Sequence, residues 1–243
     1  MSAPRRAVLL DRDGTLIDFV HHPTLGVVTS AFDPSQLRLL PGVLEGLRLL
    51  VESGFTLAIA TNQPGAAKAQ FPRTAIDQTN AALVDLLRSD GIPIARLAVC
   101  YHHPEGAPGR QRAHPPCECR KPRPGMLLSL MASLGLTPDQ TVMVGDTLAD
   151  LGAGRAAGTR TALLEGRTSR GTRQSHTRSR STALRSARPR DRPRPSRPRD
   201  KLISVIRTLF VSPSLPATPA PENPRLPCSD LSCSSRRSSP SPS

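Results

Sequence analysis

Five short apolar runs, separated by helix-like segments, most constrain what this chain can fold into. Each run has the length of a strand that is buried on both faces of a sheet. The runs are Ala7–Leu10, Thr56–Ala60, Leu97–Cys100, Thr141–Val144 and Thr161–Leu164. Because strands that alternate with helices form parallel sheets covered on both sides, the sequence predicts an α/β fold with a parallel sheet.

The segments between the runs carry helix patterns. Pro41 begins the first, apolar residues recur along one face of it, and Gly54 ends it. Three further helical segments are predicted at Ala81–Leu87, at Met126–Leu134 after Pro124, and at Leu148–Ala157.

Polar or metal-binding side chains follow four of the five runs. The clusters are Asp11-Arg-Asp13-Gly, Thr61-Asn62-Gln63, Cys100-Tyr-His102-His103 and Gly145-Asp146. In open parallel sheets the ligand lies at the carboxyl ends of the strands. We therefore expect these clusters to meet at one edge of the sheet and to form the functional site.

Asp11 and Asp13 are the pair best suited to chemistry. One carboxylate can attack a phosphorus atom and form an aspartyl-phosphate, while the other donates a proton to the leaving oxygen and later activates water. Gly14 allows the sharp turn that points both at one ligand. An Asp-x-Asp pair alone is also typical of a solvated acidic turn, but the buried run before it and Gly-Thr-Leu after it favour catalysis.

A phosphate monoester brings negative charge that cations must offset before a carboxylate can attack it. Asp146 is expected to hold Mg²⁺ together with the Asp11 carboxylate and the main-chain carbonyl of Asp13, because Mg²⁺ prefers a few oxygen ligands completed by water and phosphate. Lys121 would supply a second positive charge.

Three other polar residues are expected around the same phosphate. Thr61 offers a hydroxyl and Asn62 an amide to the phosphoryl oxygens, close to the amino end of the next helix. Asp150 would orient Lys121 or a metal-bound water. Individually, Lys121 is as typical of a protein surface, and Thr61-Asn62 of an ordinary turn.

The motifs together resemble those of the haloacid dehalogenase-like (HAD) phosphohydrolases. The matching segments are Asp11-Arg-Asp13-Gly-Thr15-Leu16, Thr61-Asn62-Gln63, Arg120-Lys121-Pro122 and Gly145-Asp146-Thr-Leu-Ala-Asp150. The resemblance spans residues 7–150 and continues to about residue 164. It implies a Rossmann-like HAD fold and a Mg²⁺-dependent phosphatase that works through an aspartyl-phosphate.

A second set of residues is similar to one group within that superfamily, which contains the heptose 1,7-bisphosphate 7-phosphatases and the histidinol-phosphate phosphatases. The set is Cys100-x-His102-His103-Pro104, followed by Cys117-Glu-Cys119-Arg120-Lys121-Pro122. In that group four such residues bind a structural zinc ion. The matching positions here are Cys100, His102, Cys117 and Cys119.

The residues themselves also favour zinc, since three thiols and an imidazole form a closed set for tetrahedral Zn²⁺. The loop between the two pairs is rich in Pro and Gly, so a metal would hold it in place and staple it to the domain. A closed set predicts a structural role. Three free thiols are the alternative interpretation, and His103 and His114 are rival ligands.

Substrate contacts follow from the resemblance. It implies that Arg120 and the loop Asp18-Phe-Val-His21-His22-Pro23 contact substrate, with His21 or His22 as the candidate in that loop, and that Asn62 and Gln63 bind the phosphate end. It favours heptose 1,7-bisphosphate, with histidinol phosphate as the alternative, although Gln63-Pro64-Gly65 departs from the Gln-Ser-Gly pattern frequent in heptose phosphatases. No segment between the motifs is long enough for a large cap domain. The site should therefore be screened only by the zinc loop and the loop at residues 18–32.

The charge pattern divides the chain into a domain at residues 1–166 and a tail at residues 167–243. The formal net charge is +14, and nearly all of it belongs to the tail. Because the tail is rich in Arg, Pro and Ser and poor in apolar residues, we expect it to be disordered. Nonspecific binding of nucleic acid or acidic surfaces through this tail is the competing function.

A frameshift is an alternative origin of the tail, since the composition changes abruptly at Arg167 and a GC-rich message in a shifted frame has this bias. The sequence shows no secretory signal and no apolar run long enough for a membrane span, which predicts a cytoplasmic enzyme. The pattern does not indicate an oligomeric state.

Overall fold

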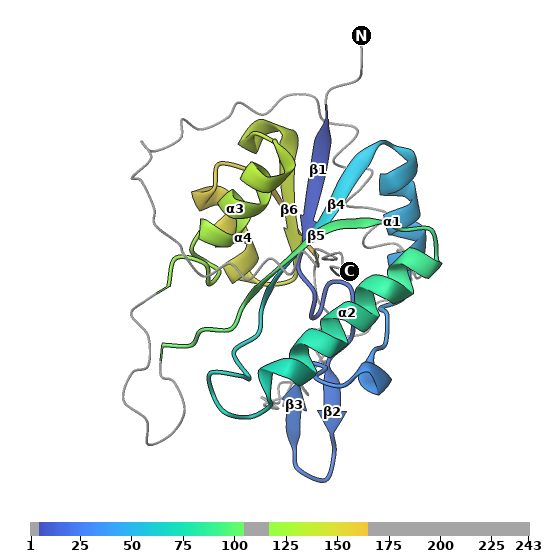
Figure 1. Cartoon of the computed structure of the whole chain (residues 1–243), viewed down its shortest axis with the longest axis vertical. Helices are drawn as coiled ribbons and strands as arrows, with labels where there is room; N and C mark the ends of the chain where they lie inside the picture. The colour runs from blue at the N-terminus through green and yellow to red at the C-terminus, as the bar shows by residue number, and fades with distance from the viewer. Residues whose placement is uncertain (1–4, 105–116, 165–243) are drawn as a thin grey trace, which may run out of the picture.

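The computed structural model describes residues 5–104 and 117–164 (Figure 1). The predicted tail at residues 167–243 and the rival ligand His114 lie outside the described residues. The strands are β1 (Arg6–Leu10), β2 (Val20–His22), β3 (Val27–Thr29), β4 (Phe55–Asn62), β5 (Ile94–Cys100), β6 (Thr141–Gly145) and β7 (Arg160–Leu163). The α-helices are α1 (Val43–Glu52), α2 (Arg73–Ser89), α3 (Gly125–Leu134) and α4 (Leu148–Ala156).

The predicted parallel sheet is confirmed. Its strand order is β5-β4-β1-β6-β7, and every neighbouring pair in it is parallel. The chain moves outward from β1 through β4 to β5 and then returns to β6 on the other side of β1. The strand order therefore reverses between β1 and β6, which is where ligands bind in open α/β sheets.

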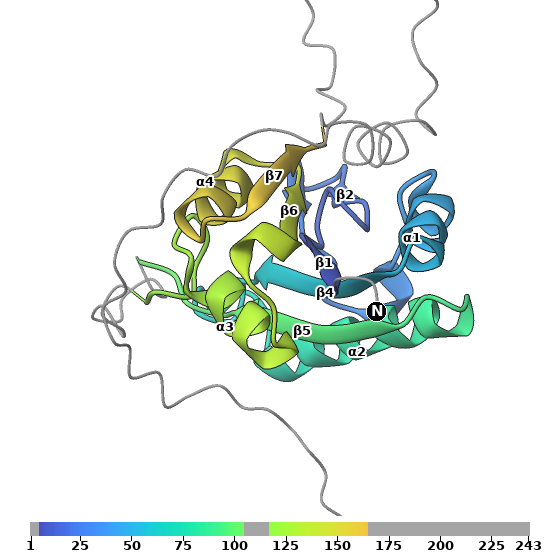
Figure 2. The same ribbon diagram turned by 90° about the horizontal axis from the view of Figure 1, so that it is seen from above.

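Alternate residues of the central strands supply two separate cores. Val8 and Leu10 of β1 face a core that contains Leu47 of α1 and Leu83 of α2. Leu9, between them, faces the second core, which is built largely from α3 together with Ala153 of α4. Figure 2 shows these helices in two layers, with α1 and α2 apart from α3 and α4. This alternation explains why the buried strands are continuously apolar in sequence.

The outer strands differ from the expectation of burial on both faces. β1 and β6 are almost entirely buried, but β5 and β7 are only half-buried because they form the two edges of the sheet. The apolar runs are similar in all five strands. The prediction of full burial is therefore wrong for β5 and β7.

The helix boundaries differ at two places. α1 begins at Val43 after Gly42, whose φ of 83° is left-handed, and not at Pro41. α2 is longer than Ala81–Leu87 and begins at Arg73, so residues 63–72 separate Asn62 from its amino end. Its first half includes the buried polar residues Thr79 and Asn80, which hid the helix pattern.

A short hairpin, β2–β3, lies within residues 18–32 and was not predicted. Its strands are antiparallel and are connected by a turn that contains Gly26. Val27 and Val28 are exposed, and Leu25 at the turn is 72% exposed. The β-branched residues on one side of a glycine turn are the pattern that could have revealed it.

In the described ranges, none of the helices combines the length and apolar content that a membrane crossing requires.

The core of the sheet predicts the effect of shortening a helix side chain. Leu47 on α1 is fully buried, whereas Leu49 on the same helix is 37% exposed. We expect Leu47→Ala to lower the free energy of unfolding by about 2–5 kcal/mol, since it leaves a cavity in packed surroundings. The matched control Leu49→Ala should cost less than about 1 kcal/mol. Urea unfolding followed by circular dichroism measures both, and equal losses would contradict the assigned packing.

Candidate active site

The loop after β1 places Asp11 and Asp13 at the carboxyl edge of the sheet. The Asp11 amide donates to the carbonyl of Val144 on β6 over 2.9 Å, which extends the pairing of these strands into the loop. Gly14 has a φ of 78°, and a Cβ at this position would collide with the carboxylate of Asp146. A glycine is therefore required both for the left-handed turn and for the close approach of Asp146.

Lys121 lies at the centre of the site. Its Nζ is 2.6 Å from Oδ1 of Asp11, 2.6 Å from Oδ1 of Asp150 and 2.7 Å from the carbonyl oxygen of Ala60. All three side chains are buried. The structure thus brings the predicted Asp150 to Lys121, the first of the two roles expected for it.

Burial and charge act on these groups in opposite directions. Burial raises the pKa of Asp11 to about 7, although the ammonium of Lys121 pulls it down. Burial also disfavours the charged form of Lys121, but the carboxylates of Asp11 and Asp150 outweigh burial and raise its pKa. Lys121 therefore remains a cation at the place where a phosphate would add negative charge.

Asp146 completes a group of three carboxylates that suits a divalent metal ion. Single oxygens of Asp11, Asp146 and Asp150 lie within 4.8 Å of one another. Oδ1 of Asp146 is buried without a hydrogen-bond partner among the described residues. Burial, followed by the charge of Asp150, raises the pKa of Asp146. An unpartnered carboxylate oxygen in an excess of negative charge is what a bound dication would satisfy.

Asp13 is held by two neighbours. The guanidinium of Arg12 donates to both of its carboxylate oxygens, and the amide of Gln63 donates to Oδ2 over 2.6 Å. The same Gln63 nitrogen donates to the hydroxyl of Thr61 over 2.9 Å. The structure thus brings Gln63, which follows β4, into contact with Asp13 on the loop after β1 and with Thr61.

Asn62 and Arg120 lie around the backbone of the segment that carries Lys121. The Asn62 side chain donates to the carbonyl of Lys121 over 3.0 Å and accepts from its amide over 3.1 Å. Arg120 is half-buried and donates to the carbonyl of His102 over 3.2 Å. These bonds hold the backbone of residues 120 and 121 in place, and with it the position from which the Lys121 side chain reaches Asp11.

The predicted zinc ligands converge in the structure. Ligand atoms of Cys100, His102, Cys117 and Cys119 all lie within 4.8 Å of one another. The Sγ atoms of Cys100 and Cys117 are 3.7 Å apart, those of Cys119 and Cys100 are 3.4 Å apart, and Nδ1 of His102 is 3.3 Å from Sγ of Cys119. A tetrahedral site with Zn–S bonds of about 2.3 Å requires ligand separations of about 3.8 Å, so the donor set fits zinc.

Neighbouring thiols also shift one another's pKa. The thiol of Cys119 donates to Cys100, and this bond is the main reason that the pKa of Cys100 falls to about 5. The same bond, together with burial, raises the pKa of Cys119. His103 is described but does not belong to the cluster of four.

His21 is a predicted substrate-binding residue that the described contacts do not connect to the carboxylates. It is exposed on β2 of the hairpin. Its neighbour His22 lies 3.0 Å from the Thr29 hydroxyl across the hairpin, as measured from Nε2.

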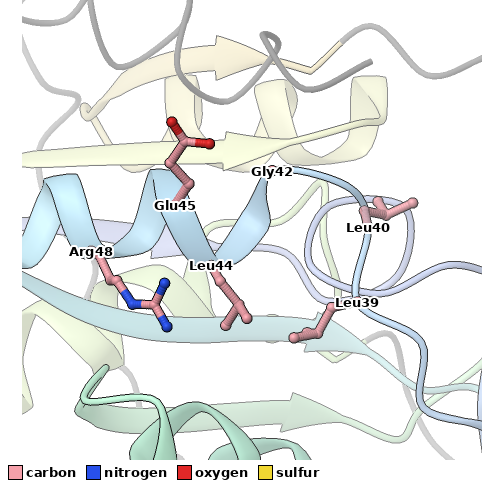
Figure 3. Close-up of a pocket in the computed structure, with 6 residues that line it drawn as sticks. All are labelled: Leu39, Leu40, Gly42, Leu44, Glu45 and Arg48. Carbon is pink, nitrogen blue, oxygen red and sulfur yellow. The ribbon is translucent and has the colours of Figure 1, made fainter. Parts of the chain in front are cut away.

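Two surface pockets lie on the described part of the chain, one beside the candidate site and one away from it. One of about 230 Å³ lies between the end of the hairpin and residues 63–71, and Gln63 and Lys68 line it. The larger pocket, about 380 Å³, lies beside the start of α1, and Leu44 and Arg48 point to one side of the helix there (Figure 3). None of the catalytic residues lines the larger pocket, so its size does not mark the active site.

Sequence reasoning missed two functional candidates, Arg12 and Asn80. Both are buried, and Nη1 of Arg12 donates to Oδ1 of Asn80 over 2.6 Å. Arg12 stood in the first motif, but its type alone gave no reason to expect burial. Asn80 had no sequence pattern that could have revealed it.

A comparison with protein families matches residues 118–186 to the model Hydrolase_like, described as HAD-hydrolase-like. The match begins inside the cysteine cluster, includes Lys121, Asp146 and Asp150, and extends into residues assigned to the tail. The domain boundary at residue 166 therefore stays a prediction.

The curated relatives carry names that are more specific than that of the family model. The chain is 34% identical over 156 residues to the D-glycero-beta-D-manno-heptose-1,7-bisphosphate 7-phosphatase of Pasteurella multocida. The matched segment covers 63% of this chain and 77% of the relative. It is 33% identical over 161 residues to the Escherichia coli K12 protein of the same name, covering 65% and 78%.

Solved structures agree with this assignment. A structure described as a HAD-like phosphatase of Mesorhizobium loti has a TM-score of 0.57 at 32% identity and covers 67% of this chain and 73% of its own. The D,D-heptose 1,7-bisphosphate phosphatase of B. bronchiseptica, complexed with magnesium and phosphate, has a TM-score of 0.55 at 27% identity, covering 66% and 81%. The chain therefore belongs to the HAD-like phosphatases, a family of phosphoric monoester hydrolases.

Proposed function

We propose that this protein is a Mg²⁺-dependent phosphatase that removes the 7-phosphate of D-glycero-β-D-manno-heptose 1,7-bisphosphate through an aspartyl-phosphate on Asp11. The observation that carries the proposal is the buried contact of Lys121 with Asp11 and Asp150, next to the unpartnered oxygen of Asp146. The names of the relatives and the magnesium and phosphate of a similar structure support the substrate and the metal.

In the first step, a carboxylate oxygen of Asp11 attacks the phosphorus atom. Lys121 donates to Oδ1 of Asp11, so it holds the carboxylate in place beside the incoming phosphoryl group and offsets its charge. The bond between phosphorus and the leaving oxygen breaks, and Asp13 gives its proton to that oxygen. Heptose 1-phosphate leaves as a neutral alcohol at the former ester position.

In the second step, Asp13 takes a proton from a water molecule as that water attacks the phosphorus. The bond between phosphorus and Asp11 breaks, which releases phosphate and restores the Asp11 carboxylate. Thr61 and Asn62 lie at the end of β4 beside this position. The Asn62 amide bonds to the Lys121 backbone. We therefore assign Asn62 two roles, to hold the segment that carries Lys121 and to bind the phosphoryl oxygens.

The metal would be held by Asp11, Asp146 and the main-chain carbonyl of Asp13, with Asp150 behind them. Mg²⁺ bound there supplies the positive charge that offsets the phosphoryl oxygens. At this place the three carboxylates of Asp11, Asp146 and Asp150 are opposed by the single ammonium of Lys121. The excess of two negative charges favours one divalent ion.

Zinc at Cys100, His102, Cys117 and Cys119 would be structural. The four ligands leave no open coordination position. Cys119 is followed directly by Arg120 and Lys121, so fastening the cluster also fixes the segment that delivers Lys121. We assign Arg120 to substrate recognition at the rim. His21, on the hairpin, stays a candidate for contact with the remote part of the substrate.

The nucleophile can be tested by substitution. Asp11→Asn should lower phosphate release from heptose 1,7-bisphosphate by at least about 10³-fold, because an amide cannot form the phosphoenzyme. Purified protein is assayed with Mg²⁺, with histidinol phosphate as the second substrate and Asp139→Asn, an exposed aspartate, as the control. Faster release from histidinol phosphate would reassign the substrate, and an Asp11→Asn variant as fast as the parent would overturn the mechanism.

Magnesium binding should depend on pH, because a proton and the metal compete for Asp11. Its pKa is raised to about 7 in the metal-free protein, mainly by burial. The metal must displace this proton below the pKa, so Mg²⁺ affinity should rise about 30-fold between about pH 5.5 and about pH 8. With an ordinary aspartate pKa the affinity would hardly change over this range. Isothermal titration calorimetry measures the constants, and Asp11→Asn should remove the dependence that Asp11 causes.

Zinc can be tested by metal analysis of the purified chain. We expect about one zinc ion per chain, and Cys119→Ser should lose most of it because one of the four ligands is removed. The matched control, Cys228→Ser, changes a cysteine that is not one of the four proposed ligands and should keep the metal. Equal zinc content in both variants would contradict the assignment.

A further inference from the structure

We propose that Arg12 is a positioning residue that, anchored by Asn80 on α2, turns the carboxyl group of Asp13 so that Oδ1 is the oxygen that carries the transferred proton. This inference rests on the proposed function, because it specifies how the general acid of that reaction is oriented. It assigns a role to two buried residues, Arg12 between the two motif aspartates and Asn80 on α2, that no sequence pattern gave reason to place in the site.

The first observation is how completely the Arg12 guanidinium is enclosed. Arg12 is 0% exposed, and it forms a fork with the carboxylate of the adjacent Asp13, from Nε to Oδ2 over 3.1 Å and from Nη2 to Oδ1 over 2.9 Å. A buried cation costs several kcal/mol unless its donors are satisfied. Two parallel bonds also fix the plane of the carboxylate, which a single ammonium could not do.

The second observation is that Arg12 is held from behind. Nη1 donates to Oδ1 of Asn80 over 2.6 Å, and Nη2 donates to the carbonyl of Ala31 over 2.9 Å. Asn80 belongs to α2, a 17-residue helix, whereas Ala31 follows the hairpin. The guanidinium is thus braced against a rigid element and cannot rotate without breaking these bonds.

Asn80 serves this contact in particular. Its Nδ2 is buried with no hydrogen-bond partner within the described ranges, so Oδ1 is the atom of the amide that is used. A buried asparagine that leaves one end unsatisfied costs stability. The bond to Arg12 is the feature of the described structure that accounts for a polar residue at this helix position.

The third observation is the difference between the two oxygens of Asp13. Oδ2 accepts from Nε of Arg12 and from Nε2 of Gln63, while Oδ1 accepts from Nη2 of Arg12 alone among the described side chains. A carboxylate oxygen has two acceptor positions. Both positions of Oδ2 are therefore filled, and Oδ1 keeps one for a proton.

The proton balance of the reaction follows from this assignment. Protonated Oδ1 donates to the leaving oxygen as the electron pair of the breaking P–O bond moves onto that oxygen. The resulting carboxylate is stabilised by the Arg12 fork, and Oδ1 then accepts a proton from the attacking water. Gln63 takes part as a positioning residue, since both hydrogens of its amide nitrogen are used, one on Asp13 and one on Thr61.

The test compares two leaving groups in the full-length protein. The alkoxide of heptose 1,7-bisphosphate needs a proton to leave, whereas the nitrophenolate of p-nitrophenyl phosphate is stable without one. Asn80→Ala removes the brace, and Asn80→Asp keeps the acceptor oxygen. Thr79→Val is the matched control, because Thr79 is buried on the same helix but donates to Ala75 and not to Arg12.

Asn80→Ala should lower kcat on the sugar phosphate by about 10–100-fold, a part of what a general acid contributes, and on p-nitrophenyl phosphate by less than about 3-fold. Asn80→Asp should restore most of the loss, and Thr79→Val should change the ratio of the two rates little. A loss of equal size on both substrates, or no loss on either, would overturn the inference.

Two further outcomes are informative. If the parent protein released phosphate from neither compound, the proposed function would fail and this inference with it, whereas an active parent with an unchanged ratio overturns the inference alone. Circular dichroism checks that each variant is folded. Should Asn80→Ala not fold, Arg12→Lys decides by the same ratio, because it keeps the positive charge but removes the two-bond fork on Asp13.

Discussion

The ammonium of Lys121, buried between the carboxylates of Asp11 and Asp150, is the interaction on which the arrangement of the site depends. Without it, the carboxylate of Asp11 after β1 and that of Asp150 in the first turn of α4 would repel one another in a medium that screens charge poorly. Without the carboxylates, the cation would be too costly to bury. The three groups come from three separate segments. Their electrostatic attraction therefore holds these segments together at the carboxyl edge of the sheet.

The segment that carries Lys121 has little apolar content of its own, and two devices hold it. Ligand atoms of Cys117 and Cys119, which precede it in the chain, lie in the cluster with Cys100 and His102. Asn62 bonds to both the amide and the carbonyl of Lys121 itself. β5 supplies Cys100, so the same strand end that borders the sheet also anchors this loop. The candidate zinc ligand Cys119 and the candidate catalytic residue Lys121 are thus close neighbours along the chain.

The parallel sheet and most of the candidate site residues could be predicted from the sequence, because buried strands and the motifs that follow them are visible in short segments of the chain. Continuous apolar runs predicted the central strands. The polar residues that follow the runs predicted Asp11, Asp146 and the start of the cysteine cluster. Edge position could not be predicted in this way, since the short apolar runs that mark β5 and β7 do not reveal that each of these strands has one neighbour. Arg12 and Asn80 are 68 positions apart, and only the folded backbone brings them together.

The long separations in this site also bear on its synthesis. Asp11 is made early, but its counter-ion Lys121 follows 110 positions later, and Asp146 and Asp150 follow that. Since chains emerge from the ribosome with the amino terminus first, the proposed nucleophile is synthesised long before its partners in the site. The proposed reactivity therefore requires that β6 has been made and paired with β1.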